Sequence, residues 1–159
     1  MSLTEEIKNK FPKYFVAAHS DFGDETISIV REGIVEVMTY LKNHPQTPFN
    51  LMLDLCGVDY LGETPRFEVV YHLYALESHT RLRIKSRVPE EDAVVSSVIH
   101  LWPAVDWYER EAWDMLGIKF HGHPKMKRLL MWEEFEGHPL RKDYPINKRQ
   151  RLPESADII

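Results

Sequence analysis

Cysteine and glycine are both scarce in this sequence of 159 residues, which contains one cysteine, Cys56, and 7 glycines. A single thiol excludes a disulfide, a four-cysteine zinc site and a cysteine-ligated iron–sulfur cluster within one chain. The glycines form neither a phosphate-binding loop nor a Gly-x-Gly-x-x-Gly or Gly-x-Ser-x-Gly motif. The chain therefore has no recognisable device for binding NADH or flavin.

Long apolar runs and a strong charge of one sign are also missing. No stretch approaches the length that crosses a bilayer, and the acidic start, Met-Ser-Leu-Thr-Glu-Glu, resembles neither a signal peptide nor a transit peptide. The net charge is −5, with 10 Lys and Arg against 16 Asp and Glu in residues 1–106 and 10 against 9 in residues 107–159. This balance is too acidic for a nucleic-acid footprint. We expect no binding of nucleic acid, and membrane association only through a partner.

What the sequence does have is the composition of an ordinary globular domain, with 43% hydrophobic and 28% charged residues. Helical spacing and capping residues predict helices, and alternating apolar residues predict strands. The helices are expected at residues 2–11, 33–43, 89–102 and 106–117, and the strands at residues 14–19, 26–30, 49–58, 67–76 and 81–88. This order predicts a two-layer α+β domain with a mixed or antiparallel sheet covered by helices.

Two of the expected strands, 67–76 and 81–88, are joined by the short loop Glu77–His79 and predict a hairpin. The first is apolar on both faces, which is typical of a central strand. The second places a row of basic residues on its outward face: Arg81, Arg83, Lys85 and Arg87. We interpret this row as a solvated face, although it could also bind an acidic partner.

The predicted helix 106–117 is the most informative stretch. Asp106 and Glu109 have the spacing of a capping box, and Gly117 can end the helix. Arg110, Glu111 and Asp114 lie opposite its apolar face, where we expect them to be free to face a partner. Glu109 instead projects among apolar residues. A carboxylate in that position needs a cationic or donor partner, or it must shift its pKa.

Glu109 has two interpretations. It can belong to a buried ion pair with Arg128 or Arg141, which we favour, or it can act as a general acid that titrates near neutrality. The ion pair predicts that Glu109→Gln strands a cation and destabilises the domain by about 3–5 kcal/mol. For Arg141→Ala we expect little change in the isolated domain and weaker assembly with a partner.

After Gly117 the sequence changes character, because prolines recur and periodicity is lost. We therefore divide the chain into a compact domain at residues 1–117 and an extended, proline-punctuated docking segment at residues 118–159. The segment carries too many large apolar residues to lie in water, among them Trp132 and Tyr144. It can wrap over another protein or fold back over its own sheet. Within it, Arg141, Lys142 and Asp143 can anchor a partner's carboxylates, or Asp143 can pair with its own neighbours.

Three histidines raise the question of a metal site. His121, His123 and His138 could bind zinc together with Glu136 or Asp143. Turn-forming glycine and prolines surround them, however, and no helical His-Glu-x-x-His spacing is present. We favour loop histidines that hydrogen-bond the backbone.

A longer pattern resembles the NuoC-type subunit of proton-pumping NADH–quinone oxidoreductase, respiratory complex I. The residues that carry the resemblance are Glu109-Arg110-Glu111, Asp114-Met115-Leu116, His123, Lys127-Arg128-Leu129-Leu130 and Gly137 to Pro145, with Leu53 to Leu55, Val58 to Tyr60, Phe67 to Leu73 and Ser97 to Trp107 before them. The resemblance covers about Phe49 to Pro145 and is highly specific in combination. Residues 1–48 are less diagnostic.

The resemblance implies a non-redox structural subunit of the peripheral arm, on the cytoplasmic side of a bacterial inner membrane. It implies docking on the large subunit that is homologous to a nickel–iron hydrogenase, beside the iron–sulfur subunits and near the quinone site. NADH, FMN, iron–sulfur clusters and quinone would then bind to other subunits, and none to this chain. The motif residues would serve as structural anchors and Trp132, Arg141, Lys142, Asp143 and Tyr144 as docking residues.

Two alternatives remain. Related domains occur in membrane-bound hydrogenases and in dehydrogenases that do not use NADH, so the electron donor of the complex stays open. From a different class, a free-standing metal-dependent hydrolase could use the three histidines. Elemental analysis showing near one zinc per chain, lost in His123→Ala, would favour that hydrolase.

Overall fold

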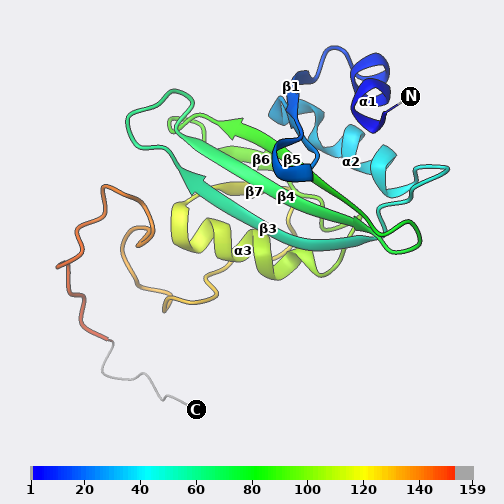
Figure 1. Cartoon of the computed structure of the whole chain (residues 1–159). Coiled ribbons are helices and arrows are strands. Elements are labelled where there is room, and N and C mark those ends of the chain that lie inside the picture. Colours follow the sequence, from blue (N-terminus) through cyan, green and yellow to red (C-terminus); the bar gives the residue numbers. More distant parts are fainter. Residues whose placement is uncertain (1, 153–159) are drawn as a thin grey trace.

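The computed structural model describes residues 2–152, which form a mixed sheet with helices followed by an irregular C-terminal segment (Figure 1). The α-helices are α1 (Leu3–Lys10), α2 (Ile34–Lys42) and α3 (Val105–Leu116), and the 3-10 helices are η1 (Asp21–Gly23) and η2 (Arg31–Gly33). The strands are β1 (Phe15–His19), β2 (Thr26–Ile29), β3 (Leu51–Asp59), β4 (Phe67–Ala75), β5 (Thr80–Val88), β6 (Val94–Ser96) and β7 (Lys119–His121). The expected α+β architecture is confirmed.

The main sheet has five strands in the order β1-β2-β5-β4-β3. Strands β4 and β5 pair antiparallel from Phe67↔Val88 to Ala75↔Thr80, as the hairpin prediction required. Strands β1 and β2 also pair antiparallel, but β2 pairs parallel with β5, which makes the sheet mixed. Strand β4 therefore lies second from the β3 edge and contributes five fully or nearly buried core side chains: Phe67, Val69, Tyr71, Leu73 and Ala75.

Helices α2 and α3 bury their apolar faces in one core with the inward side chains of the sheet. Helix α3 lies along β3, and the C-terminal segment continues beyond it, away from α1 and α2 (Figure 1). Gly57 on β3 makes close helix packing possible, because a Cβ there would lie 2.4 Å from a Leu116 methyl carbon. This contact fixes where α3 sits on the sheet.

The helix expected at residues 89–102 is wrong. Val94–Ser96 instead forms β6, which pairs parallel with β7 in a second, two-stranded sheet. Arg31 holds the start of this strand, since its guanidinium donates to the carbonyls of Asp92 and Val94 and pairs with the Asp92 carboxylate. Tertiary pairing thus overrides the acidic first turn and apolar spacing that favour a helix.

The chain stays packed after Gly117. Ile118 and Phe120 are buried in the core, and β7 forms the second sheet with β6. After His121, as far as residue 152, the structure has turns and irregular backbone without further helices or strands in the described part. The division at residue 117 stays a prediction, but the packed part extends at least through β7.

Candidate functional site

Helix α3 and the residues that wrap its C-terminal end form the centre of the molecule's polar contacts. The helix begins at Val105 without a side-chain cap, so the expected Asp106–Glu109 capping box is wrong. Gly117 does end it, with a left-handed φ of 81° and its N–H bonded to the Trp113 carbonyl. A capping box does occur at α1, where the Ser2 hydroxyl accepts from the Glu5 N–H and the Glu5 carboxylate accepts from the Ser2 N–H.

The last carbonyls of α3 are bound by the C-terminal segment. His138 Nδ1 donates to the Asp114 carbonyl at 3.0 Å, the Leu140 N–H to Met115 at 3.0 Å and Arg141 Nε to Leu116 at 2.7 Å. A helix end leaves these acceptors unpaired unless another part of the chain supplies donors. The cationic Arg141 also complements the negative end of the helix dipole. Residues 138–141 of the segment therefore complete the hydrogen bonding of the helix C-terminus.

The Asp114 carboxylate holds a second part of the segment. Its side chain is fully buried and accepts from the backbone N–H groups of Leu129, Leu130 and Met131, and from Arg128 Nη1 at 2.6 Å. Burial raises its pKa, but the hydrogen bonds outweigh burial and lower it overall. Asp114 is thus an anionic anchor for the backbone turn at residues 129–131.

Arg110 acts similarly on the same face of α3. Its guanidinium is mostly buried and donates to the carbonyls of Lys127 and Arg128. The sequence suggested that Asp114 and Arg110 are free to face a partner. This is wrong, because the chain's own C-terminal segment covers both side chains. Glu111 is exposed, as expected.

Among residues 2–152 Glu109 has no cationic partner, so the predicted ion pair with Arg128 or Arg141 is wrong. The fully buried carboxylate accepts from the Ser97 hydroxyl at 2.6 Å and from the Val98 N–H at 2.9 Å. Arg128 pairs with Asp114 instead. Burial without a compensating cation raises the pKa of Glu109 to about 7, although the two hydrogen bonds oppose the rise. The buried hydroxyl of Tyr71 has no hydrogen-bond partner among the described residues. Burial raises the pKa of this hydroxyl, and the charge of Glu109 raises it further.

A third anchor is centred on Arg66, which the sequence did not single out. Its buried guanidinium pairs bidentately with the buried Asp59 at 2.8 Å and also reaches Asp143 at 2.7 Å and Glu90 at 2.7 Å. The same Asp59 accepts from the Lys142 N–H. Arg66 lowers the pKa of Asp59, and also lowers that of Asp143. The strand parity could have revealed the site, because Asp59 shares the inward face of β3 with Leu55.

The predicted docking residues therefore contact the domain of their own chain in part. Asp143 pairs with Arg66 and Arg141 binds the end of α3, whereas the Lys142 side chain is exposed. Trp132 packs edge-on against Phe135, with ring centroids 4.9 Å apart, and Tyr144 stacks on Phe135 with ring centroids 6.0 Å apart. Their role toward a partner stays a prediction.

The three histidines proposed as zinc ligands do not converge. His138 is bound to the Asp114 carbonyl, and its pKa is lowered by burial despite that bond. His123 Nδ1 accepts from the Lys125 N–H, and its Nε2 lies 3.1 Å from Asp106 Oδ1 without the angle of a hydrogen bond. No three metal-binding atoms from this set lie together among the described residues. The zinc-hydrolase alternative thus lacks a site here.

Comparison with known proteins identifies the family of this chain. The family model of the 30 kDa subunit of respiratory-chain NADH dehydrogenase matches residues 27–150. The chain belongs to this family. The matched range contains β2 except its first residue, β3 to β7, α2, α3 and all three anchors described above.

Two relatives illustrate the range of the family, and both are C-type subunits of NADH-quinone oxidoreductase. The one from Rhizobium etli (strain CIAT 652), which carries the number 2 in its name, is 51% identical over 124 residues, which are 78% of this chain and 66% of the relative. The one from Roseiflexus sp. (strain RS-1) is 42% identical over 149 residues, 94% of this chain and 86% of the relative. The resemblance inferred from the motif residues is confirmed.

Two solved structures share the fold. The trypsin-resistant fragment of Nqo5 has a TM-score of 0.68 and 31% identity, covering 79% of this chain and 99% of the fragment. A chain of the membrane-bound sulfane sulfur reductase, an archaeal respiratory membrane complex, has a TM-score of 0.76 and 26% identity, covering 96% of this chain and 94% of that one. The second likeness extends into the C-terminal segment, because it covers nearly the whole of this chain.

Proposed function

We propose that this chain is a structural subunit of the peripheral arm of a proton-pumping NADH–quinone oxidoreductase and that it holds no redox group of its own. Family membership supports a place in such a complex. The lack of a nucleotide-binding loop and the single cysteine support a role without NADH, flavin or cluster binding. Electrons would pass from NADH to quinone through FMN and iron–sulfur clusters on other subunits.

The C-terminal segment is the part that we assign to partner binding. The observation that carries this assignment is its combination of buried polar anchors with exposed apolar side chains. Asp114 and Arg66 hold the segment on the domain, while the exposed fractions of Leu130, Leu140 and Ile146 are 57%, 62% and 104%. A segment that is fixed in place yet presents apolar surface is typical of a protein–protein contact.

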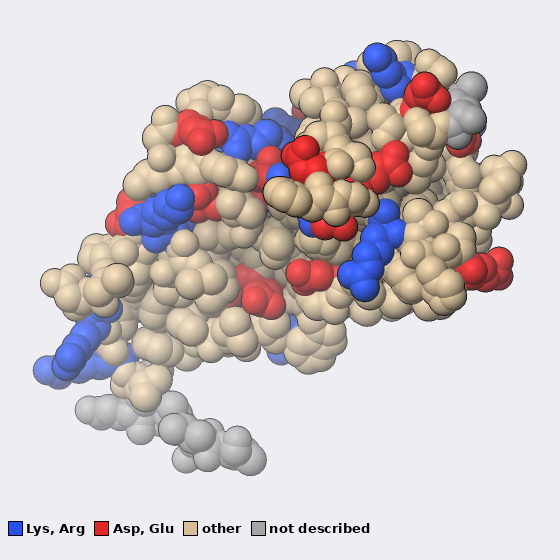
Figure 2. Space-filling model, in the orientation of Figure 1, with Lys and Arg blue, Asp and Glu red and all other residues tan. Residues whose placement is uncertain are grey.

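The partner that we propose is the hydrogenase-like large subunit, with the iron–sulfur subunits and the quinone site nearby. Membrane association then comes only through the complex, on the cytoplasmic side of the bacterial inner membrane. Among residues 2–152, none of the helices combines the length and hydrophobicity that a bilayer crossing requires. Positive and negative side chains are interspersed on the face shown in Figure 2, which offers no single-sign surface for an anionic membrane or nucleic acid.

A double substitution tests the docking assignment. We expect Leu140→Asp with Ile146→Asp to leave the thermal melting of the isolated chain unchanged, because both side chains are exposed. Co-expressed with the large subunit, the variant should co-purify at least about tenfold less, since buried charge at an interface is costly. Phe22→Asp is the matched control, as Phe22 is also fully exposed but lies in η1, near the N-terminus. Wild-type co-purification of the double variant would contradict the assignment.

A related complex with another electron donor is a second candidate, which the likeness to the sulfane sulfur reductase chain favours. The two are separated by assaying membranes with and without the gene for this chain. Loss of NADH-dependent quinone reduction supports the first candidate, whereas its persistence alongside loss of another respiratory activity supports the second. In either case the purified chain alone should be colourless and should not oxidise NADH.

A further inference from the structure

The outward face of the main sheet carries a cluster that the proposed function does not use. On β3 and β4, the side chains of Asp54, Cys56 and His72 point to this face, and Asp54 lies directly opposite His72 in the antiparallel pairing. The adjacent inward residues of the same strands, Leu55 and Leu73, are buried in the core. The cluster is thus built on two rigid, paired strands.

A bulge in β3 creates this arrangement. The pairing passes from Met52↔Leu73 to Asp54↔His72, so Leu53 is an extra residue on β3. Without it, strict alternation would place Asp54 on the face of the buried Met52, and His72 would face Leu53. The extra residue reverses the parity of β3 and brings first Asp54 and then Cys56 beside His72.

The ligand atoms of these three residues all lie within 4.8 Å of one another, and they are the only such trio in the described part of the chain. Around a tetrahedral zinc ion, N, O and S ligands lie about 3.4–3.7 Å apart, given metal–ligand distances of about 2.0–2.3 Å. Small side-chain rotations close the difference. We propose that Asp54, Cys56 and His72 bind one divalent transition-metal ion of the zinc class, with water in the fourth position.

The three side chains are free to bind it. Within residues 2–152 none of them makes a hydrogen bond or ion pair, whereas His44, His123 and His138 are all engaged. Burial lowers the pKa of His72, and Arg83 adds to this effect, so the imidazole is neutral and can donate a lone pair near pH 7. His72 therefore needs no deprotonation before it ligates.

Cys56 does need deprotonation. Partial burial raises the pKa of its thiol, and the charges of Asp54, Glu111 and Glu68 raise it further while Arg83 lowers it. The metal ion therefore replaces the thiol proton, and one proton per ion is released to the buffer. The resulting thiolate and the Asp54 carboxylate together neutralise a divalent cation.

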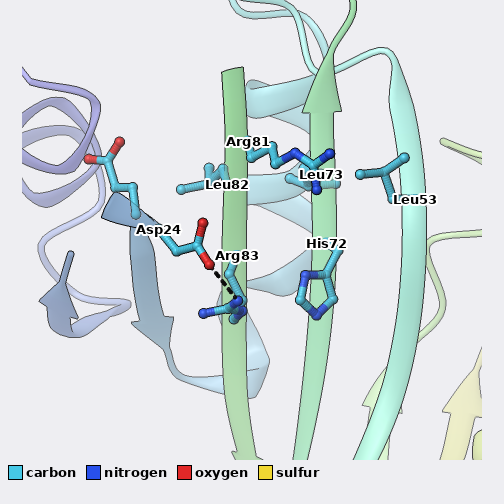
Figure 3. A pocket seen from close by; sticks show the side chains of 8 residues that line it. Asp24, Leu53, His72, Leu73, Arg81, Leu82 and Arg83 are labelled. Atoms are coloured by element: carbon cyan, nitrogen blue, oxygen red, sulfur yellow. Dashed lines mark hydrogen bonds and ion pairs between the residues drawn. The ribbon is translucent and has the colours of Figure 1, made fainter. Parts of the chain in front are cut away.

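The surrounding charges are compatible with a cation. Figure 3 shows His72 on β4 beside Arg83 on β5, with the Arg83 guanidinium held by Asp24, and Leu53 on β3. Glu68 on the same face is paired with Lys85 at 3.3 Å. The neighbouring cations are thus partly neutralised by carboxylates, which leaves the three uncommitted groups as the local ligands.

Cobalt titration tests the proposal, because Cys56 is the only thiol and any thiolate-to-cobalt charge-transfer absorption must come from it. We expect the full 159-residue chain to bind one Co²⁺ with this absorption and to exchange it for one Zn²⁺ per chain. Cys56→Ser should abolish the absorption. Asp54→Asn and His72→Gln should weaken zinc binding at least about tenfold. His79→Gln and His123→Gln are matched controls that should bind as wild type.

The outcomes separate the proposed site from other modes of binding. Calorimetry in two buffers of different ionisation enthalpy should report release of one proton per zinc ion. Half an ion per chain with dimer formation, binding that survives in Cys56→Ser, or no cobalt absorption at all would each overturn the site. The variants lie at the sheet surface, and circular dichroism melting verifies that they fold. None of these readouts depends on the assembly proposed above.

Discussion

At the scale of single residues, Glu109 shows how strongly the surroundings decide the chemistry of a side chain. The sequence identified it as a carboxylate among apolar residues, and it is indeed fully buried. What stabilises it is a hydroxyl and a backbone N–H rather than a cation. Its pKa of about 7 lies above its ordinary value of 4.5. The folded state therefore binds a proton in the interval where the unfolded state has released it.

This difference predicts the pH dependence of stability. The contribution of Glu109 is fully present below pH 4.5 and is lost as the pH rises through about 7. We expect the ionisation of Glu109 to lower the free energy of unfolding by about 3 kcal/mol between pH 4.5 and about 7. In Glu109→Gln this fall should be absent, because the amide stays neutral. Urea unfolding at several pH values between about 5 and 8 measures it.

The control is Glu111→Gln, which removes an exposed carboxylate from the same helix. His72 and His138 have lowered pKa values and oppose the trend, since each favours folding as the pH rises. The comparison of the two glutamine variants cancels their effect. An equal pH slope in both variants would mean that Glu109 is already ionised in the folded state.

Arg66 provides a prediction at the same scale. Arg66→Ala leaves the Asp59 carboxylate buried without its cation, because only 2% of that side chain is exposed. We expect the free energy of unfolding to fall by about 3–5 kcal/mol in chemical denaturation. Arg87→Ala, which removes a solvent-accessible pair with Glu63 and a contact with the Tyr60 ring, should cost less than about 1 kcal/mol. Similar losses in both variants would show that the buried Asp59 pair contributes no more to stability than the solvent-accessible Glu63 pair.

At the scale of elements, α3 is both a core helix and the attachment point of the C-terminal segment. Its inward face packs on β3, and its C-terminal carbonyls bind residues 138–141. Asp114 binds the turn at residues 129–131. One helix thus holds residues 129–131 and 138–141 of a segment that has no helix or strand of its own in its described part after β7.

Asp114→Asn tests this attachment. The substitution removes the charge that pairs with Arg128 and weakens three backbone hydrogen bonds. We expect a loss of about 3–5 kcal/mol in the free energy of unfolding. Trypsin should also cleave faster at Lys125 and Lys127, because the turn is no longer held. Glu134→Gln, an exposed change in the same segment, should alter neither. Unchanged cleavage in Asp114→Asn would show that the segment is held elsewhere.

The elements themselves were predictable to an unequal degree. The β4–β5 hairpin and the end of α3 at Gly117 follow from alternation and from a left-handed glycine, which are local properties. The 89–102 helix was wrong because β6 gains its partner only from β7, which follows α3 in the chain. The bulge at Leu53 could not be predicted from the sequence either, because an extra residue is defined only by the pairing with the neighbouring strand.

At the scale of the whole molecule, three anchors join the C-terminal segment to the domain. They are centred on Asp114, on Arg66 and on the end of α3, and each joins residues far apart in the sequence. The exposed apolar side chains of the segment are therefore presented from a fixed base. The co-purification experiment tests whether these exposed side chains bind the partner while the anchored backbone stays in place.

The sequence alone determined the family, the α+β class and most strands and helices, because these depend on motifs and on local periodicity. It also marked Glu109 and Asp114 as residues that carry the resemblance. Only the tertiary structure decided their partners: hydrogen-bond donors for Glu109, Arg128 for Asp114, and Asp59 and Asp143 for Arg66. The pairing of buried charges depends on how segments distant in the chain pack together. Local residue spacing does not determine that packing.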